Sequence, residues 1–536
     1  MSLEIIEVVR KTLIIAVLVI PVIQFLRSRS NAQRGARTPP GPKPLPVIGN
    51  LLDIPTERPW LRYTEWGKVY GDVVHLTAMG QSIIVLNSAK AIYDLLDRRG
   101  NIYSDRARVV MAGDLQVYLV GYNNSPFLGP NGPRHKEYRR LFAEVISNRK
   151  VEEWRPVQQE KVIKLAAQIM KSPEAFRSHI KNHTGNLILE MSHGHIVKDE
   201  NDPIMALSQE VDHHFSEMVV PGAFLVDLFP ILRFVPQWTG VSFQKKAQKY
   251  RETLNTALEW PWQKVKDEIA AGTALPSFGA TLIERREKPT EDEEFNFKWV
   301  TLAFVLAGTD TSYGSLSSFV LAMALNPEVQ RKAQAEIDAI VGHSRLPTFK
   351  DREDLPYVEG LVREVYRYNP VGPIASPHRL TTEADDIYRD WLIPRGSIVI
   401  ANSWQVRPCL LGVMHDPEVY PDPFEFKPER YDLVKSKDGF RIWNDPLSPE
   451  QMVNPDPKKF AFGYGRRICP GHVLADDTVY MGIVTMLALF DVGPLTSGDP
   501  PLYTPYLISH PEHFTCLMKP RSQQARDLVL KDTGRV

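Results

Sequence analysis

The chain has 536 residues, of which 43% are hydrophobic, and its 64 basic residues balance its 64 acidic residues. This length exceeds what one hydrophobic core usually organises, and it is sufficient to enclose a large ligand. The zero net charge creates no bulk field for a polyanion, so we predict no nucleic-acid partner. Only three cysteines are present, which argues against a disulfide scaffold and favours a reducing compartment.

The N-terminal segment contains an apolar run without charges, from Thr12 to Leu26. A basic cluster follows this run, at Arg27, Arg29, Arg34 and Arg37. Positive charge after an apolar segment predicts that the remainder of the chain stays on the cytosolic side. We therefore predict a signal-anchor transmembrane helix over residues 1–28. A buried core helix is the alternative, because the run is shorter than the roughly 20 apolar residues that span a bilayer.

A proline-rich segment, Pro39–Pro46, follows and leads into Val47–Asn50. Proline interrupts helices and favours a stiff extended chain. We predict that residues 29–50 form a basic, proline-rich hinge. The hinge would hold the globular part, residues 51–536, at a defined distance from the anchor.

The globular part shows two kinds of periodicity. Short alternating runs at Val73–Thr77 and Ile83–Leu86 predict a small sheet. From about residue 135 to about residue 370 the pattern is mainly helical. Asn326 followed by Pro327 predicts a helix start with an asparagine cap. The sequence therefore predicts a mainly α fold with a small β region.

Near the C-terminus the sequence has the pattern F-x-x-G-x-R-x-C-x-G, formed by Phe462, Gly465, Arg467, Cys469 and Gly471. A lone cysteine cannot build a tetrahedral zinc site. One thiolate is enough, however, as the protein ligand of a haem iron, because the porphyrin supplies four donors. The glycines let the backbone approach a flat macrocycle, and the Arg467 guanidinium suits a propionate. A buried structural cysteine in a glycine-rich turn is the alternative.

This run resembles the cysteine-ligand loop of the cytochrome P450 family, and the likeness covers about residues 39–520. The resemblance implies a haem-thiolate fold with haem b (iron protoporphyrin IX), with Cys469 as the metal ligand. Phe462, Arg467 and Gly471 would contact the cofactor. The sequence of the loop is most similar to that of fungal microsomal family members that act in secondary metabolism, including O-methylsterigmatocystin oxidoreductase-like and tryptamine-hydroxylating enzymes.

The same resemblance implies a location and a partner. The protein would be a single-pass protein of the endoplasmic reticulum membrane, with residues 51–536 as a cytosolic catalytic haem domain. Electrons would come from NADPH through a separate cytochrome P450 reductase, because the sequence shows no flavin or nucleotide motif. Lys458, Lys459 and Arg466 flank the cysteine loop and would meet an acidic reductase, although solvated surface charges would look the same.

Polar residues interrupt a long apolar helical pattern at Gly308, Asp310 and Thr311. A threonine in mid-helix often satisfies only the carbonyl one turn earlier. Together with Ala307, however, these residues match the oxygen-activating helix of the family. By that resemblance Thr311 would hydrogen-bond the oxygen being activated, and Asp310 would help to relay protons from solvent.

Four further segments match or depart from family patterns. Glu364 and Arg367, with Arg430 downstream, resemble a structural Glu-Arg-Arg cluster. His378 matches a frequent propionate contact, with a plain surface histidine as the alternative. Arg139 matches the second basic residue of a propionate-binding W-R-x-x-R segment. His135 replaces the tryptophan of that segment and Lys136 its first arginine, which puts the anchoring by this segment in doubt.

About seven extra residues precede His415 compared with typical relatives, within the segment 405–414. This insertion is either a genuine surface loop, which costs little free energy, or an error in deriving the protein sequence. We favour the second reading slightly. The haem site is expected to survive in either case.

The substrate is expected to be a neutral lipophilic small molecule, with a terpenoid or polyketide as our guess. The apolar stretch from Val219 to Pro236 predicts a lid that dips into the bilayer, with ordinary core beneath a loop as the alternative. By analogy the pocket is walled by Phe304, Ala307, Val371, Ile374, Ala375 and the segment 503–508. We therefore predict a monooxygenase. The alternatives are a haem-thiolate isomerase or dehydratase that needs no O2, and a non-catalytic haem-binding protein.

Overall fold

The computed structural model describes residues 37–113, 119–199, 201–220, 222–235, 242–286, 288–404, 414–417, 419–431, 434–435, 441–442, 455–496 and 498–533. The predicted anchor, residues 1–28, and the first part of the hinge lie outside these ranges. So do residues 405–413, which form most of the predicted insertion.

The described chain is mainly helical. Its helices are α2 (Pro59–Tyr70), α3 (Ala89–Ile92), α4 (Gly100–Tyr103), α5 (Pro133–Ile146), α6 (Arg155–Lys171), α7 (Phe176–His193), α8 (Pro203–Met218), α9 (Leu225–Leu228), α10 (Ser242–Ala270), α11 (Phe278–Glu284), α12 (Glu291–Leu325), α13 (Pro327–Ile340), α14 (Pro356–Tyr368), α15 (Lys458–Ala461), α16 (His472–Leu489) and α17 (Gln523–Thr533). The strands are β1 (Val73–Ala78), β2 (Gln81–Leu86), β3 (Asp105–Arg106), β4 (His378–Arg379), β5 (Asp386–Tyr388), β6 (Trp391–Ile393), β7 (Ile398–Ala401), β8 (Val434–Lys435), β9 (Arg441–Ile442), β10 (Phe490–Leu495) and β11 (Cys516–Pro520).

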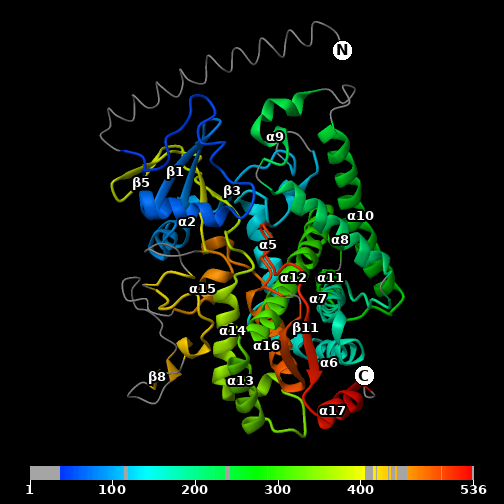
Figure 1. Cartoon of the computed structure of the whole chain (residues 1–536). Coiled ribbons are helices and arrows are strands. Elements are labelled where there is room, and N and C mark those ends of the chain that lie inside the picture. The colour runs from blue at the N-terminus through cyan, green and yellow to red at the C-terminus, as the bar shows by residue number, and fades with distance from the viewer. Residues whose placement is uncertain are drawn as a thin grey trace.

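Helix α12 organises the helical part and runs through its middle (Figure 1). It begins at a capping box in which the Glu293 amide donates to the Thr290 hydroxyl and the Thr290 amide donates back to Glu293. Its first half packs into a core with α5, α7, α8, α10 and α11. Its second half packs into a different core with α6, α13, α14 and α16. One helix thus joins two cores, and its centre lies at their junction.

The predicted strands form part of a five-stranded sheet with the order β1-β2-β7-β4-β3. Strands β1 and β2 are an antiparallel hairpin, as the alternating pattern predicts, and β2 pairs with β7 in parallel. The far edge is made of two short strands, in which Arg106 of β3 lies opposite His378 of β4. The sheet therefore brings two basic side chains from distant segments to one edge.

The described end of the hinge packs against this sheet. The His75 amide of β1 donates to the Pro40 carbonyl at 3.0 Å, and the Thr77 amide donates to the Asn50 side chain at 3.0 Å. A Cβ atom on Gly41 would lie 1.9 Å from the His75 carbonyl oxygen, so only glycine fits there. Residues 37–50 are thus part of the globular domain rather than a free spacer.

The predicted Glu-Arg-Arg cluster is present, and its members Glu364 and Arg367 are fully buried. Both Arg367 nitrogens that face Glu364 donate to its carboxylate at 2.7 Å, and Arg430 donates to it at 3.2 Å. Arg367 also donates to the carbonyls of Met414 at 2.8 Å and Pro423 at 2.7 Å. The pair therefore ties α14 to the segment that precedes the cysteine loop.

The two flanks of the predicted insertion meet in space. The Met414 amide donates to the Ser403 carbonyl at 3.4 Å, and Met414 is fully buried. The chain therefore leaves and re-enters the core at one place. The surrounding core is therefore complete whether the segment 405–414 is a genuine surface loop or an error in the protein sequence.

Candidate functional site

The centre of α12 is less buried than the rest of the helix. Residues 306–311 are half-exposed, whereas residues 299–305 and 312–324 are almost all buried. This stretch includes Ala307, Gly308, Asp310 and Thr311, the residues that the sequence singled out. Helix α16, which begins three residues after Cys469, packs against α12. The two sequence motifs thus belong to neighbouring elements.

The backbone of the cysteine loop requires glycine at two positions. Gly463 and Gly465 have φ values of 80° and 55°, in the region that favours glycine. A Cβ atom on Gly465 would lie 2.1 Å from the Leu96 carbonyl oxygen. The Cys469 amide donates to the Phe462 carbonyl at 2.7 Å, which closes the loop around the cysteine. The motif therefore holds the sulfur at a defined place.

The Cys469 side chain is half-buried and stands beside positive groups. Burial raises the pKa of the Cys469 thiol, while a hydrogen bond from the Gly471 amide and the charge of Arg139 act to lower it. Arg139, on α5, also donates to the Ile468 carbonyl. These two groups would stabilise a thiolate, which is the form that ligates a metal.

Beside the loop, Arg106, His378 and Arg467 form a cluster of buried basic side chains, which we call the basic recess. His378 is 2% exposed, and its Nδ1 lies 2.7 Å from the Tyr103 carbonyl oxygen. Arg467 donates to the carbonyls of Ser104 and Gly129, each at 2.7 Å. Arg106 donates to the Phe127 and Ser376 carbonyls at 3.0 and 2.6 Å. The carbonyls fix the orientation of the arginines without neutralising their charge.

The ionisable groups of this cluster carry an excess of positive charge. Burial and Arg467 lower the pKa of Arg106 to about 9. Burial and the nearby arginines lower the pKa values of both His135 and His378 to about 3. Asp105 is the carboxylate that acts in the opposite direction on Arg106 and Arg467. A ligand with two carboxylates, such as haem b with its propionates, would satisfy this cluster.

The structure corrects the reading of the α5 segment. His135 is buried in the basic recess, where its ring lies under the influence of Arg139, Arg467 and Arg106. Lys136, expected to replace the first arginine of the family pattern, is exposed. Arg106 was not predicted at all, because nothing in a two-residue strand marks it as a site residue. Its role becomes visible only through the pairing of β3 with β4.

The acid–alcohol pair of α12 has clear contacts. The Thr311 hydroxyl donates its proton to the Ala307 carbonyl at 2.6 Å, which is the local hydrogen bond expected of a threonine in mid-helix. The hydroxyl oxygen can still accept a second hydrogen bond. The charge of Asp310 acts on a second carboxylate, that of Asp212 on α8. Burial and the charge of Asp310 raise the pKa of Asp212 to about 7, and Lys181 of α7 acts to lower it.

Aromatic rings stand next to these carboxylates. Phe215, one turn after Asp212 on α8, lies 5.1 Å from the Tyr122 ring and 6.1 Å from the Phe127 ring. Tyr122 in turn lies 6.1 Å from Trp299 of α12. The Phe127 carbonyl accepts the hydrogen bond from Arg106 described above. This cluster of aromatic side chains thus extends from the basic recess to the carboxylates of Asp212 and Asp310. Of the expected pocket walls, Phe304 and Ile374 are buried, whereas Ala307, Val371 and Ala375 are half-exposed.

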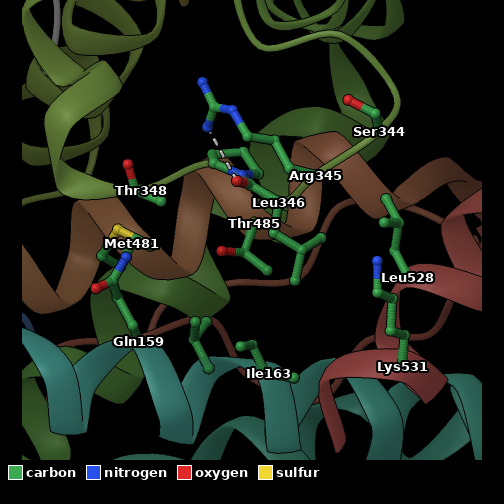
Figure 2. Close-up of a pocket in the computed structure, with 12 residues that line it drawn as sticks. Gln159, Ile163, Ser344, Arg345, Leu346, Thr348, Met481, Thr485, Leu528 and Lys531 are labelled. Carbon is green, nitrogen blue, oxygen red and sulfur yellow. Dashed lines mark hydrogen bonds between the residues drawn. The ribbon is translucent and has the colours of Figure 1, made fainter. Parts of the chain in front are cut away.

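A separate hollow of about 280 Å3 lies between α6, the segment after α13, α16 and α17 (Figure 2). Its walls include Ile163, Leu346, Met481 and Leu528, with Lys531 at its edge. No predicted site residue lines it. Arg345, also in its wall, is already paired with Asp351 at 2.6 Å.

The structure also bears on the expected surfaces. Lys458 is paired with Glu359 at 2.7 Å and Asp476 at 2.9 Å, so part of its charge is already compensated within the domain. Arg466 is exposed. Within the described ranges, α16 is the helix long and apolar enough to cross a membrane, but 72% of it is buried in the core.

The fold is mainly helical, with a positioned cysteine, a cluster of basic groups beside it and a polar break in the central helix. This combination is that of a haem-thiolate protein. The chain belongs to the cytochrome P450 family, whose model matches residues 39–518. It is therefore an oxygen-incorporating oxidoreductase that uses haem b.

Similar proteins are fungal cytochrome P450 monooxygenases. Cytochrome P450 monooxygenase 208 of Postia placenta is 37% identical over 521 residues, which cover 96% of each chain. Cytochrome P450 monooxygenase claR of Ampulloclitocybe clavipes is 38% identical and covers 92% of this chain and 88% of its own. The tryptamine 4-monooxygenase of Psilocybe cyanescens is 37% identical and covers 92% of this chain and 94% of its own.

The basic recess leads to a prediction about cofactor retention. Arg106→Gln is expected to accelerate haem loss tenfold or more, because a hydrogen bond to a charged group contributes about 1.5–3 kcal/mol. Arg106→Lys should recover part of the effect, since it restores the charge without the fork. Haem transfer to apomyoglobin measures the rate. Arg108→Gln, at an exposed position two residues away, is the control, and equal rates for both glutamine variants would contradict the assignment.

Proposed function

We propose that this protein is a membrane-anchored monooxygenase that oxidises a small lipophilic secondary metabolite. It would use O2 and electrons from NADPH, delivered by a cytochrome P450 reductase at the endoplasmic reticulum membrane. Haem b, when bound, supplies the activation of O2 and its insertion into a C–H bond. The positions of the site residues support these roles: Cys469 would hold the iron, and the basic recess would hold the propionates.

One observation carries this proposal. An acid and an alcohol, Asp310 and Thr311, lie in the half-exposed centre of α12, and α12 packs against α16, the helix that follows Cys469. An isomerase or dehydratase needs no proton delivery for O–O cleavage, so this pair favours oxygen chemistry over that alternative. The charges of Asp310 and of the exposed Lys181 both act on Asp212, which supports a connection from Asp310 through Asp212 to solvent. The aromatic surroundings support a lipophilic substrate.

The test is a carbon-monoxide difference spectrum of the reduced full-length protein, followed by turnover with a reductase. A red-shifted thiolate-type Soret band and product formation that requires both NADPH and reductase are expected. Product formation without NADPH would instead support the isomerase or dehydratase alternative. A Soret band with no turnover on any lipophilic substrate would support a non-catalytic haem protein.

Thr311→Ala is expected to separate electron consumption from product formation. General acid–base groups typically contribute about 10²–10⁴-fold, and water can replace them in part, so we expect a loss of at least about tenfold in product per NADPH consumed. Thr309→Ala is a matched control, because Thr309 makes the same type of hydrogen bond to Val305, at 3.0 Å. An unchanged product yield in Thr311→Ala would contradict the role of this hydroxyl.

A further inference from the structure

We propose that the hollow of about 280 Å3 between α6, α16 and α17 is a second binding site, and that its ligand is a small aromatic hydroxy acid. The carboxylate would pair with Lys531 at the edge, the ring would lie between the apolar walls, and the hydroxyl would meet Thr485 inside (Figure 2). Among the described residues, none that was predicted for the haem site lines this hollow. The inference therefore goes beyond the proposed function and does not depend on the substrate of the haem site.

The size and the walls of the hollow suit one aromatic ring with a short chain. An apolar cavity of about 150 Å3 is enough to hold benzene, so this hollow has room for a ring and several further atoms. A methionine thioether, here that of Met481, makes favourable contacts with the edges of aromatic rings. The apolar lining residues are Val162, Ile163, Leu346, Pro347, Met481 and Leu528.

Thr485 provides an independent sign of a ligand. The residue is 2% exposed, and its side chain points from α16 into the hollow (Figure 2). Its hydroxyl has no hydrogen-bond partner among the residues that the structure describes. Thr478, two turns earlier on the same helix, instead donates its hydroxyl proton to the Leu474 carbonyl at 2.9 Å, which is the usual bond of a threonine in mid-helix. Leaving a buried polar group unpaired is costly, so a ligand oxygen beside Thr485 is expected.

A second polar group in the lining agrees with this. The Gln159 side-chain amide also lines the hollow and has no hydrogen-bond partner in the described ranges. A hydroxyl group can both donate and accept hydrogen bonds. It therefore suits a lining that offers a threonine hydroxyl and a glutamine amide better than a purely apolar ligand would.

The lining of the hollow carries positive charge and no carboxylate. Its two basic residues are Arg345 and Lys531. Arg345 is already neutralised, because it donates to both oxygens of the Asp351 carboxylate, at 2.8 and 2.6 Å. Lys531, in the last turn of α17, is exposed and has no ion-pair partner within the described part of the chain. An anionic group at this edge of the hollow is therefore favoured, and a carboxylate is small enough to leave the ring between the walls.

The test uses 4-(4-hydroxyphenyl)butyrate as the probe and two relatives for comparison. 4-Phenylbutyrate lacks only the hydroxyl, and 4-(4-hydroxyphenyl)butan-1-ol carries an uncharged group in place of the carboxylate. Binding to the ferric full-length holoenzyme is measured by calorimetry after saturation with 1-phenylimidazole, which keeps the haem site occupied. We expect one probe molecule per protein and an affinity at least about threefold higher than that of either relative, because a hydrogen bond and a partly exposed ion pair each contribute modestly.

Matched variants assign the two preferences to two side chains. Thr485→Val keeps the shape of the side chain and should bind the probe and 4-phenylbutyrate equally, whereas Thr485→Ser should retain the preference for the hydroxyl. Lys531→Gln should bind the probe and the uncharged alcohol equally. Arg526→Gln changes an exposed cation of the same helix outside the lining and should behave like the native protein. A normal carbon-monoxide band in each variant shows that the fold is intact.

Hydrogen exchange locates the bound probe. We expect slower amide exchange in the second half of α16 and in α17 when the probe is bound. No binding to the native protein, or equal affinity for all three compounds, would overturn the proposal. So would a Thr485→Val variant that still prefers the hydroxyl, or slower exchange confined to the centre of α12, which would place the probe at the haem site instead.

Discussion

Cys469→Ser is expected to abolish the thiolate-type Soret band of the reduced carbon-monoxide complex and to lower monooxygenase turnover below detection. A serine hydroxyl is not deprotonated at neutral pH and is a harder, weaker donor to iron than a thiolate. The fold of the loop should persist, because it depends on the backbone hydrogen bond from residue 469 to the Phe462 carbonyl and on two glycines with positive φ. Loss of the band without loss of structure is therefore the expected result.

The other described cysteine provides the control for this experiment. Cys516, in β11, is 7% exposed, and burial raises the pKa of its thiol to about 12, so it stays protonated and cannot act as the ligand. Cys516→Ser should keep the thiolate-type band. Difference spectra and haem content of both variants decide the matter. A thiolate-type band in Cys469→Ser would remove the basis of the proposed function.

Arg367→Leu is expected to cost about 3–5 kcal/mol in the free energy of unfolding, because it leaves a buried carboxylate without its main partner. Glu364 and Arg367 are both 0% exposed, so solvent cannot replace the lost contact. The carbonyls of Met414 and Pro423 would lose their donor at the same time. Proteins of this kind have only about 5–15 kcal/mol of stability, so we expect poor expression and low haem content.

Urea unfolding of purified protein measures this loss, and an exposed pair serves as the control. Arg62 donates to Glu65 at 2.7 Å on the surface of α2, and Arg62→Leu should cost under about 1 kcal/mol. Arg367→Lys should recover only part of the stability, because an ammonium cannot make the two parallel hydrogen bonds to Glu364. A cost for Arg367→Leu as small as that for Arg62→Leu would show that the cluster does not hold this region together.

Local patterns predicted several elements correctly. The alternating runs that indicated strands correspond to β1 and β2, and the Glu-Arg spacing of α14 correctly indicated the buried cluster. The expected cap at Asn326 is wrong in its detail. Helix α13 begins at Pro327, but the Asn326 side chain donates to the Ala322 carbonyl at 2.8 Å. It therefore satisfies the end of α12 instead of the start of α13, since α12 ends only one residue earlier.

Long-range contacts account for what the sequence could not predict. Lys458 is adjacent to the cysteine loop in sequence, yet it pairs with Glu359 and Asp476, which come from two other helical segments. His135 was doubted because a histidine ring is smaller than an indole, yet it lies within the influence of Arg139 on its own helix and of Arg106 and Arg467 from two other segments. The charge of a residue is visible in the sequence, but its partners are set by tertiary packing.

The sequence by itself determined the cysteine loop, the polar break in α12 and the mainly helical class, because each depends on residues within a few turns of one another. Tertiary structure alone decided which charges share a space. The pairing of β3 with β4 places Arg106 beside His378, and the packing of α8 against α12 places Asp212 beside Asp310. Electrostatic interaction depends on distance in space, not on separation along the chain, so the cluster of basic residues appears only once the chain is folded.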